Sequence, residues 1–82
     1  MAPRPADTAP AGPLYRVQVG AFAARENADE LVAALRADGF NPYIVRERGL
    51  LKVRVGAFRD RALAGELADR LRAEGYQVVI VF

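Results

Sequence analysis

The chain carries one phrase twice, VQVGAF at residues 17–22 and VRVGAF at residues 53–58, and this repetition constrains the fold more than any other feature. A constant shift that places Val17 on Val53 aligns the segment from Leu14 onward with the end of the chain, and many of the aligned positions are identical. Solenoids need about three or more stacked copies. Two copies in a chain of 82 residues, which has room for one core, therefore indicate a single domain with internal two-fold pseudosymmetry.

Each copy predicts a strand followed by a helix. LYRVQV at residues 14–19 and LLKVRV at residues 50–55 alternate apolar and polar side chains, which is the period of a strand with one buried face. We expect Gly20 and Gly56 to supply backbone freedom at strand-to-helix turns. Apolar residues then recur at the i, i+3, i+4, i+7 spacing of a helix with one buried stripe. These positions are Ala28, Leu31, Val32 and Leu35 in the first copy and Ala64, Leu67, Ala68 and Leu71 in the second.

The ends of the two helices are also marked. Gly39 and Gly75 follow the last periodic leucine of each copy, where glycine takes the left-handed conformation that ends a helix. Asp60 is a good N-cap for the second helix. Its counterpart Ala24 offers no side-chain acceptor, and that absence should cost the first helix about 1 kcal/mol.

The resulting order is β-α-β-β-α-β, with NPYIV at residues 41–45 and QVVIVF at residues 77–82 as the remaining strands and RERG at residues 46–49 as a turn. Right-handed crossovers favour an α+β fold of the ferredoxin/RNP-like type. We expect a four-stranded antiparallel sheet in the order 4-1-3-2, with both helices on one face.

The start of the chain differs in composition. Four of the five prolines fall within residues 1–13, among Ala, Gly, Asp and Thr. This composition predicts a flexible Pro/Ala-rich linker at residues 1–13 and one folded domain at residues 14–82. The linker contains no apolar signal-peptide segment, so we expect any export signal to belong to a larger parent protein.

The two central strands send polar and basic side chains to the face that the helices leave uncovered. If the valines of these strands face the helices, the intervening residues face the other way. These residues are Arg16, Gln18, Lys52 and Arg54. The adjoining turn adds Arg46 and Arg48 against a single acid, Glu47. This concentration of positive charge favours an anionic ligand.

Catalysis, a metal site and a cofactor are not expected. The chain has no cysteine and no histidine, and its only Ser/Thr hydroxyl is Thr8 in the linker, so the usual nucleophile and metal-ligand sets are missing. RVQVGAF at residues 16–22 resembles the phosphate loop of acylphosphatases. However, Val19 separates the glutamine from the glycine, and Ala23 stands where that family has arginine.

Two non-enzymatic alternatives remain for this fold. A single-stranded nucleic-acid-binding domain would stack bases on aromatics of the central strands, but the outward positions there are polar or charged, so we expect no nucleic acid. A dimeric regulatory domain could pair through the apolar stretch VVIVF at residues 78–82. The oligomeric state is left open.

Residues 14–82 resemble the SPOR domain, also called the sporulation-related repeat domain. The resemblance rests on YRVQVGAF, ENADELVAALRADGF, GLLKVRVGAF and ALAGELADRLRAEGY in this order and spacing. It implies a bacterial, non-catalytic module that binds peptidoglycan and prefers glycan strands stripped of their stem peptides. It also implies a parent cell-wall or division protein, brought to the septum in the periplasm or facing the cell wall. A membrane would then be met only through the parent protein.

The resemblance also assigns candidate glycan-binding residues on the uncovered face. The family's positions fall on Gln18, Ala21, Leu50 and Lys52, with Ile80 on the last strand. Arg16 and Arg54 join this set from the alternation described above. Leu50 stands where some members carry an aromatic residue, and Ala21 where some carry serine, so we expect weak binding.

Overall fold

The computed structural model describes residues 14–82 and contains six elements in the expected order. They are β1 (Tyr15–Phe22), α1 (Arg25–Ala37), β2 (Tyr43–Glu47), β3 (Leu50–Phe58), α2 (Arg61–Ala73) and β4 (Val79–Val81). The linker expected at residues 1–13 lies outside the described residues. The predicted β-α-β-β-α-β order is confirmed. The bounds differ, because β1 and β3 continue through the Gly-Ala-Phe of each phrase, and because Arg46 and Glu47 belong to β2 rather than to the turn.

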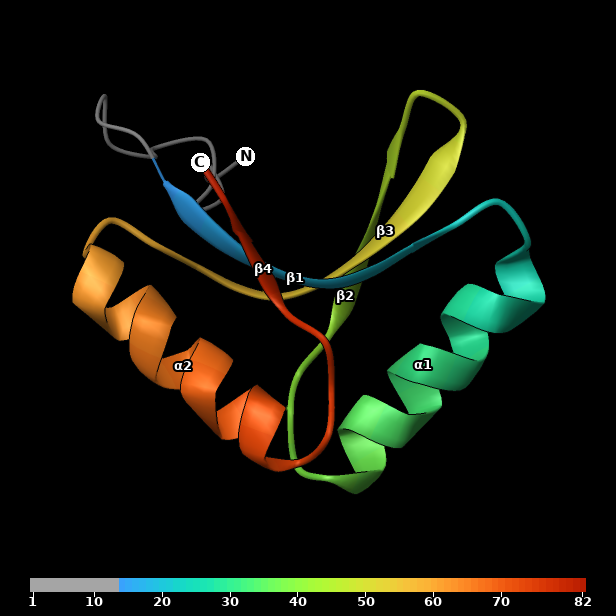
Figure 1. The fold of residues 1–82 in the computed structure, drawn as a ribbon. Helices are drawn as coiled ribbons and strands as arrows, with labels where there is room; N and C mark the ends of the chain where they lie inside the picture. The colour runs from blue at the N-terminus through green and yellow to red at the C-terminus, as the bar shows by residue number, and fades with distance from the viewer. Residues whose placement is uncertain (1–13) are drawn as a thin grey trace, which may run out of the picture.

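The strands form one sheet in the order β2-β3-β1-β4, with antiparallel pairing throughout. This is the predicted order 4-1-3-2 read from the other edge. Both helices lie on the same side of the sheet, and the hairpin of β2 and β3 rises on the opposite side (Figure 1). At the tip of that hairpin Arg48 and Gly49 have φ values of 52° and 80°, as a tight two-residue turn requires.

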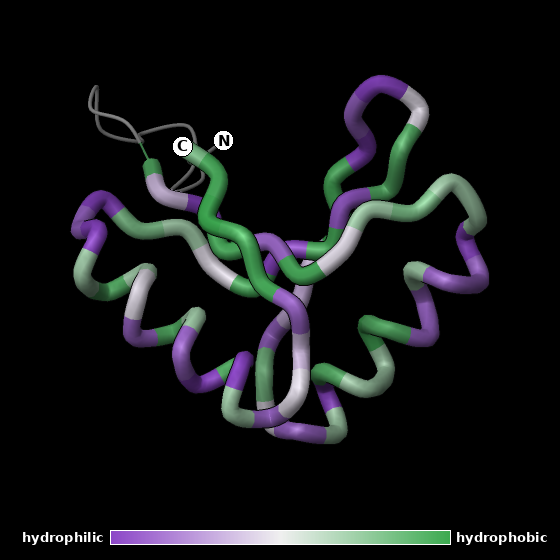
Figure 2. The backbone as a smooth tube through the Cα atoms, viewed as in Figure 1, coloured by the Kyte–Doolittle hydropathy of each residue, from purple (hydrophilic) through white to green (hydrophobic). Residues whose placement is uncertain are grey.

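The core lies between the sheet and the two helices. Its largest fully buried side chains come equally from the two copies of the repeat: Val17 and Leu35 from the first, Val53 and Leu71 from the second. The helices alternate hydrophobic and hydrophilic residues along their length, as expected for elements that bury one stripe (Figure 2).

The predicted helix ends are confirmed. At the end of α1, Gly39 has φ 92° and its N–H donates to the Arg36 carbonyl at 3.0 Å, while the Phe40 N–H donates to the Leu35 carbonyl at 3.0 Å. This pair of bonds is a Schellman motif. Gly75 repeats it after α2, with φ 98°.

The helix starts differ as the sequence predicts. Asp60 Oδ1 accepts a 2.8 Å hydrogen bond from the Ala62 N–H at the start of α2. Ala24 has the extended backbone of an N-cap but makes no side-chain bond at the start of α1. The first copy therefore lacks one capping interaction that the second copy has.

The two C-terminal helix ends are joined by side chains. The Tyr76 hydroxyl donates to Asp38 Oδ2 at 2.6 Å, and the Arg70 guanidinium lies 5.6 Å from the centre of the Phe40 ring. The hydrogen bond to Asp38 raises the pKa of Tyr76 to about 12. These contacts connect the two halves of the repeat below the sheet.

The pairing of the central strands is interrupted by bulges. Val17 pairs with Gly56, Gln18 with Arg54, and Gly20 with Val53, so one extra residue lies on either side of the Gln18–Arg54 pair. The simple alternation therefore changes phase. Beyond the bulge Gly20 and Phe22 face the helices, and Ala21 between them faces away.

The expectation that Gly20 and Gly56 lie in turns is wrong. Both residues lie inside strands, and neither has a positive φ. A Cβ at Gly20 would lie 2.7 Å from a ring carbon of Phe22, and one at Gly56 would lie 3.0 Å from the equivalent carbon of Phe58. Glycine is required here because each phenylalanine ring folds back over it.

Candidate functional site

The sheet surface away from the helices, called the open face below, is defined by the strand register. Residues directly opposite each other on antiparallel strands project to the same side. The open face comprises Arg16, Gln18, Ala21, Tyr43, Val45, Glu47, Leu50, Lys52, Arg54, Ala57, Val79 and Val81. No helix covers it in the described part of the chain (Figure 1).

One row of side chains crosses all four strands. Tyr43 on β2 pairs with Arg54 on β3, Arg54 with Gln18 on β1, and Gln18 with Val79 on β4. This central row is its own image under the internal repeat, which places Gln18 on Arg54 and Tyr43 on Val79. Its two ends are apolar and exposed, at 40% for Tyr43 and 57% for Val79. The polar pair between them is less exposed to solvent, and Arg54 is only 5% exposed.

Four polar side chains of the open face form one connected network: Gln18, Glu47, Lys52 and Arg54. Arg54 Nε donates to Gln18 Oε1 at 3.2 Å, and Arg54 Nη2 donates to Glu47 Oε1 at 3.4 Å. Lys52 Nζ donates to the same Glu47 oxygen at 2.9 Å. The hydrogen bond and charge of Lys52, with a further contribution from Arg54, lower the pKa of Glu47 below its usual value. The open face therefore has three cations, counting Arg16, and one carboxylate that stays ionised.

The structure brings six of the seven predicted site residues to the open face. Gln18, Arg54, Lys52, Ala21 and Arg16 lie on the central strands, with Ala21 paired to Lys52. Leu50 lies beside Glu47 at the hairpin end of the same face. Ala21 reaches this side only because the bulge changes the phase of β1.

Ile80 does not join them. It pairs with the fully buried Val17 and packs against the core on the helix side. Its neighbours Val79 and Val81 occupy the open face instead. The physical reason is the alternation of β4, because Val79 lies opposite the outward-facing Gln18 and the next residue must then face inward.

Tyr43 and Val79 were not among the site residues predicted from the sequence. A signal was present in the repeat, which aligns Tyr43 with Val79 and Ile44 with Ile80. Ile44 and Ile80 both face the helices, opposite Val53 and Val17, so their preceding residues both face outward. The aromatic surface that the central strands lack is thus supplied by the edge strand β2.

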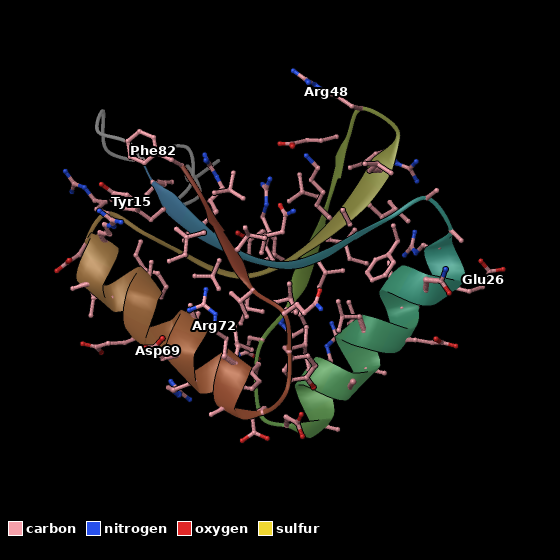
Figure 3. The ribbon with its side chains drawn as sticks, viewed as in Figure 1. Tyr15, Glu26, Arg48, Asp69, Arg72 and Phe82 are labelled. Atoms are coloured by element: carbon pink, nitrogen blue, oxygen red, sulfur yellow. The ribbon has the colours of Figure 1, made fainter. Side chains whose placement is uncertain are left out.

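Arg46 and Arg48 are separate from this network. Arg46 lies on β2 opposite the buried Leu51, so it projects to the helix side and not to the open face as expected. Arg48 projects from the hairpin tip, away from the body of the sheet (Figure 3). At the far end of the sheet, Tyr15 and Phe82 lie with their ring centres 5.0 Å apart beside an open hollow (Figure 3). Among residues 14–82 no cluster of acidic side chains is suited to a metal ion. Neither of the two described helices is long and apolar enough to cross a membrane.

Comparison with known proteins agrees with this architecture. The family model of the SPOR domain matches residues 11–82. Among solved structures, the chain is similar to the peptidoglycan binding domain of the B. subtilis cell wall lytic enzyme CwlC, with a TM-score of 0.78 and 36% identity. The similarity covers 89% of this chain and 92% of that one. No curated protein matches the chain.

Proposed function

The chain belongs to the SPOR domain family, and from this membership we propose that it is a non-catalytic module that binds peptidoglycan through its open face. The observation that carries the proposal is the central row, in which a hydrogen-bonding pair lies between two exposed apolar side chains. A glycan offers the complementary surface, because its sugar rings have apolar faces and polar edges. The similar domain of CwlC is itself described as peptidoglycan binding.

Tyr43 and Val79 would contact the apolar faces of the sugars. Three inter-strand steps of about 4.8 Å separate the two ends of the row, which therefore spans about 14 Å of sheet. The tyrosine ring offers a large contact area with little loss of conformational freedom. It compensates in part for Leu50 and Ala21, the positions where the chain lacks the aromatic and the hydroxyl of some family members.

The preferred form of the ligand is a glycan strand without stem peptides. Peptide removal restores a free lactyl carboxylate on each muramic acid, whereas an attached peptide converts that carboxylate into a neutral amide. Lys52 and Arg16 can form charge-assisted hydrogen bonds to a carboxylate, and these are stronger than bonds to an amide. Selectivity for stripped strands thus follows from charge. By this binding the module would bring a parent cell-wall or division protein to the septum, in the periplasm or facing the cell wall.

Co-sedimentation with isolated peptidoglycan sacculi tests the function. We expect residues 14–82 to sediment with sacculi, and more so after an amidase has removed the stem peptides. The double variant Gln18→Ala, Lys52→Ala should lose most of this binding. Arg36→Gln removes one exposed charge from α1, outside the open face, and should bind as wild type does.

Four results would contradict the proposal or a part of it. Failure of the wild-type domain to sediment with either preparation would exclude peptidoglycan binding. Equal recovery with intact and stripped sacculi would exclude the preference for stripped strands. Undiminished binding by the double variant would move the site away from the open face. A single-stranded RNA of similar length serves as the competing polyanion, and salt-sensitive binding to it alone would instead favour a nucleic-acid-binding domain.

A further inference from the structure

The orientation of the Gln18 amide is determined by its neighbour. Arginine has no acceptor atom, so the Gln18 atom that faces Arg54 Nε at 3.2 Å must be the carbonyl oxygen. A flipped amide would set N–H groups against the guanidinium. Gln18 Nε2 therefore points away from Arg54, and none of the hydrogen bonds among residues 14–82 uses it. The side chain keeps two N–H donors for a ligand and commits its acceptor to the protein.

Arg54 is itself held in place. Its second hydrogen bond runs from Nη2 to Glu47 Oε1 at 3.4 Å, and the side chain is almost fully buried. A buried side chain held by two hydrogen bonds cannot turn outward without giving up both of them, and Gln18 Oε1 would then lose its partner. Arg54 thus acts on a ligand through Gln18 rather than by direct contact.

The centre of the open face therefore offers donors almost exclusively. Gln18 Nε2, Lys52 Nζ and the Arg16 guanidinium have only N–H groups to give. The one carboxylate nearby, Glu47, accepts from both Lys52 and Arg54 through Oε1, so its single negative charge is outweighed by those of its two cationic partners. Such a surface recognises acceptor groups and repels cations.

We infer that Arg54 is a positioning residue that makes this centre a donor-rich, net positive subsite, and that the domain consequently selects N-acetylated over N-deacetylated glycan. The inference rests on the proposed function. The acetamide carbonyl of an N-acetyl sugar accepts from Gln18. Deacetylation replaces that carbonyl with an ammonium group, which has three donors, no acceptor and a positive charge. The Gln18 donors then lose their partner while Lys52 and Arg54 repel the new cation, so binding should weaken about tenfold, or about 1.4 kcal/mol.

Titration with two matched glycan preparations tests this selectivity. One batch of stripped strands is chemically N-deacetylated, and half of it is then N-acetylated again. The two halves therefore have the same chain length and differ only in the final acetylation. Dissociation constants are measured by calorimetry at pH 6. At this pH amines with a pKa near that of an α-amino group, about 7.7–8.0, are protonated, and Glu47 is ionised because its pKa is lowered. The wild-type domain should bind the acetylated half about tenfold more tightly.

Two variants isolate the role of the amide. Gln18→Glu keeps the shape of the side chain but replaces its donors with acceptors, so the preference should disappear or reverse. Arg54→Lys keeps the charge but loses the Nε donor that orients Gln18, so the ratio of the two dissociation constants should fall toward one. Arg36→Gln should keep the wild-type ratio. A merely structural role for Arg54 would weaken binding to both preparations equally and leave the ratio unchanged.

The outcomes separate this inference from the proposed function. Equal wild-type affinity for the two preparations would overturn the selectivity and leave peptidoglycan binding intact. Absence of binding to both would overturn the proposed function, and the inference with it. A tenfold wild-type preference that persists in both Gln18→Glu and Arg54→Lys would show that selection occurs elsewhere. If Arg54→Lys does not fold, the persistence of the preference in Gln18→Glu is by itself sufficient to overturn the assignment.

Discussion

Replacing Gly20 by alanine should destabilise the domain, although alanine is favoured over glycine in most strands. The added Cβ would lie 2.7 Å and 2.9 Å from two ring carbons of Phe22 and 3.0 Å from a methyl carbon of Leu31. Carbon atoms pack best at about 3.5–4.0 Å, so the ring and the leucine must both move. Overpacking of this kind costs about 1–3 kcal/mol. The lower backbone entropy of alanine in the unfolded chain returns about 0.5–1 kcal/mol. The expected net loss therefore lies between about 0 and 2.5 kcal/mol of unfolding free energy, and the middle of the two ranges gives about 1 kcal/mol.

Two other glycines provide matched controls. A Cβ at Gly56 meets the equivalent ring at 3.0 Å and Leu67 at 3.1 Å, so Gly56→Ala should lose less than Gly20→Ala. A Cβ at Gly65, inside α2, meets nothing within 4 Å, so Gly65→Ala should gain about 0.8–1.0 kcal/mol from helix propensity. Urea unfolding followed by far-UV circular dichroism gives all three values, and 1 kcal/mol corresponds to about 4–8 °C in Tm for a domain of this size.

The ranking of the three variants is the decisive result. If Gly20→Ala proves as stable as wild type while Gly65→Ala gains as expected, the ring does not fold tightly over the glycine in solution. A larger loss at Gly56 than at Gly20 would likewise refute the packing argument, because the closer contact would then be the less costly one.

Three further predictions concern the helix ends. Ala24→Asp should stabilise the domain by about 1 kcal/mol, because the backbone at Ala24 is already that of an N-cap. Asp60→Ala should destabilise it by a similar amount. Thermal unfolding of both variants would disprove the capping argument if their unfolding temperatures changed in the same direction. Gly75→Ala should cost about 1–3 kcal/mol, because φ at this residue is 98°, and urea unfolding with an unchanged midpoint would contradict that strain. Tyr76 should titrate at about 12 in an absorbance titration at 295 nm, and Tyr76→Phe should remove this step. Because the pKa of Tyr76 in the folded state lies above the usual value of 10.0, the bond to Asp38 stabilises the fold below pH 10, and this stabilisation is lost as pH rises towards 12. A wild-type titration without a tyrosine step near 12 would refute the bond.

Much of the fold follows from short-range patterns. Three of these patterns depend only on residues that are close together in the chain, so they can be predicted from the sequence. They are the period of two in each strand, the apolar stripe of each helix and the glycine after each last leucine. The Asp60 cap and its absence at Ala24 are of the same kind. The repeat adds the overall symmetry, and handedness rules then leave one sheet order to expect.

The candidate site depended on longer-range information. Gln18 and Lys52 could be placed on the open face from alternation alone. Ala21 required the bulge. Ile80, assigned from the family resemblance, faces the helices because it lies opposite the buried Val17. The burial of Arg54 depends on Gln18 and Glu47, which come from two other strands.

The sequence by itself determined a duplicated β-α-β unit, its helix ends and a basic strand surface, because each of these arises from contacts between near neighbours in the chain. Only the tertiary structure decided which residues share the central row, why Gly20 must be glycine, and that the acceptor of Gln18 is committed to Arg54. Those features depend on the register between strands far apart in the sequence. A shift of one residue in that register turns every side chain beyond it to the opposite face.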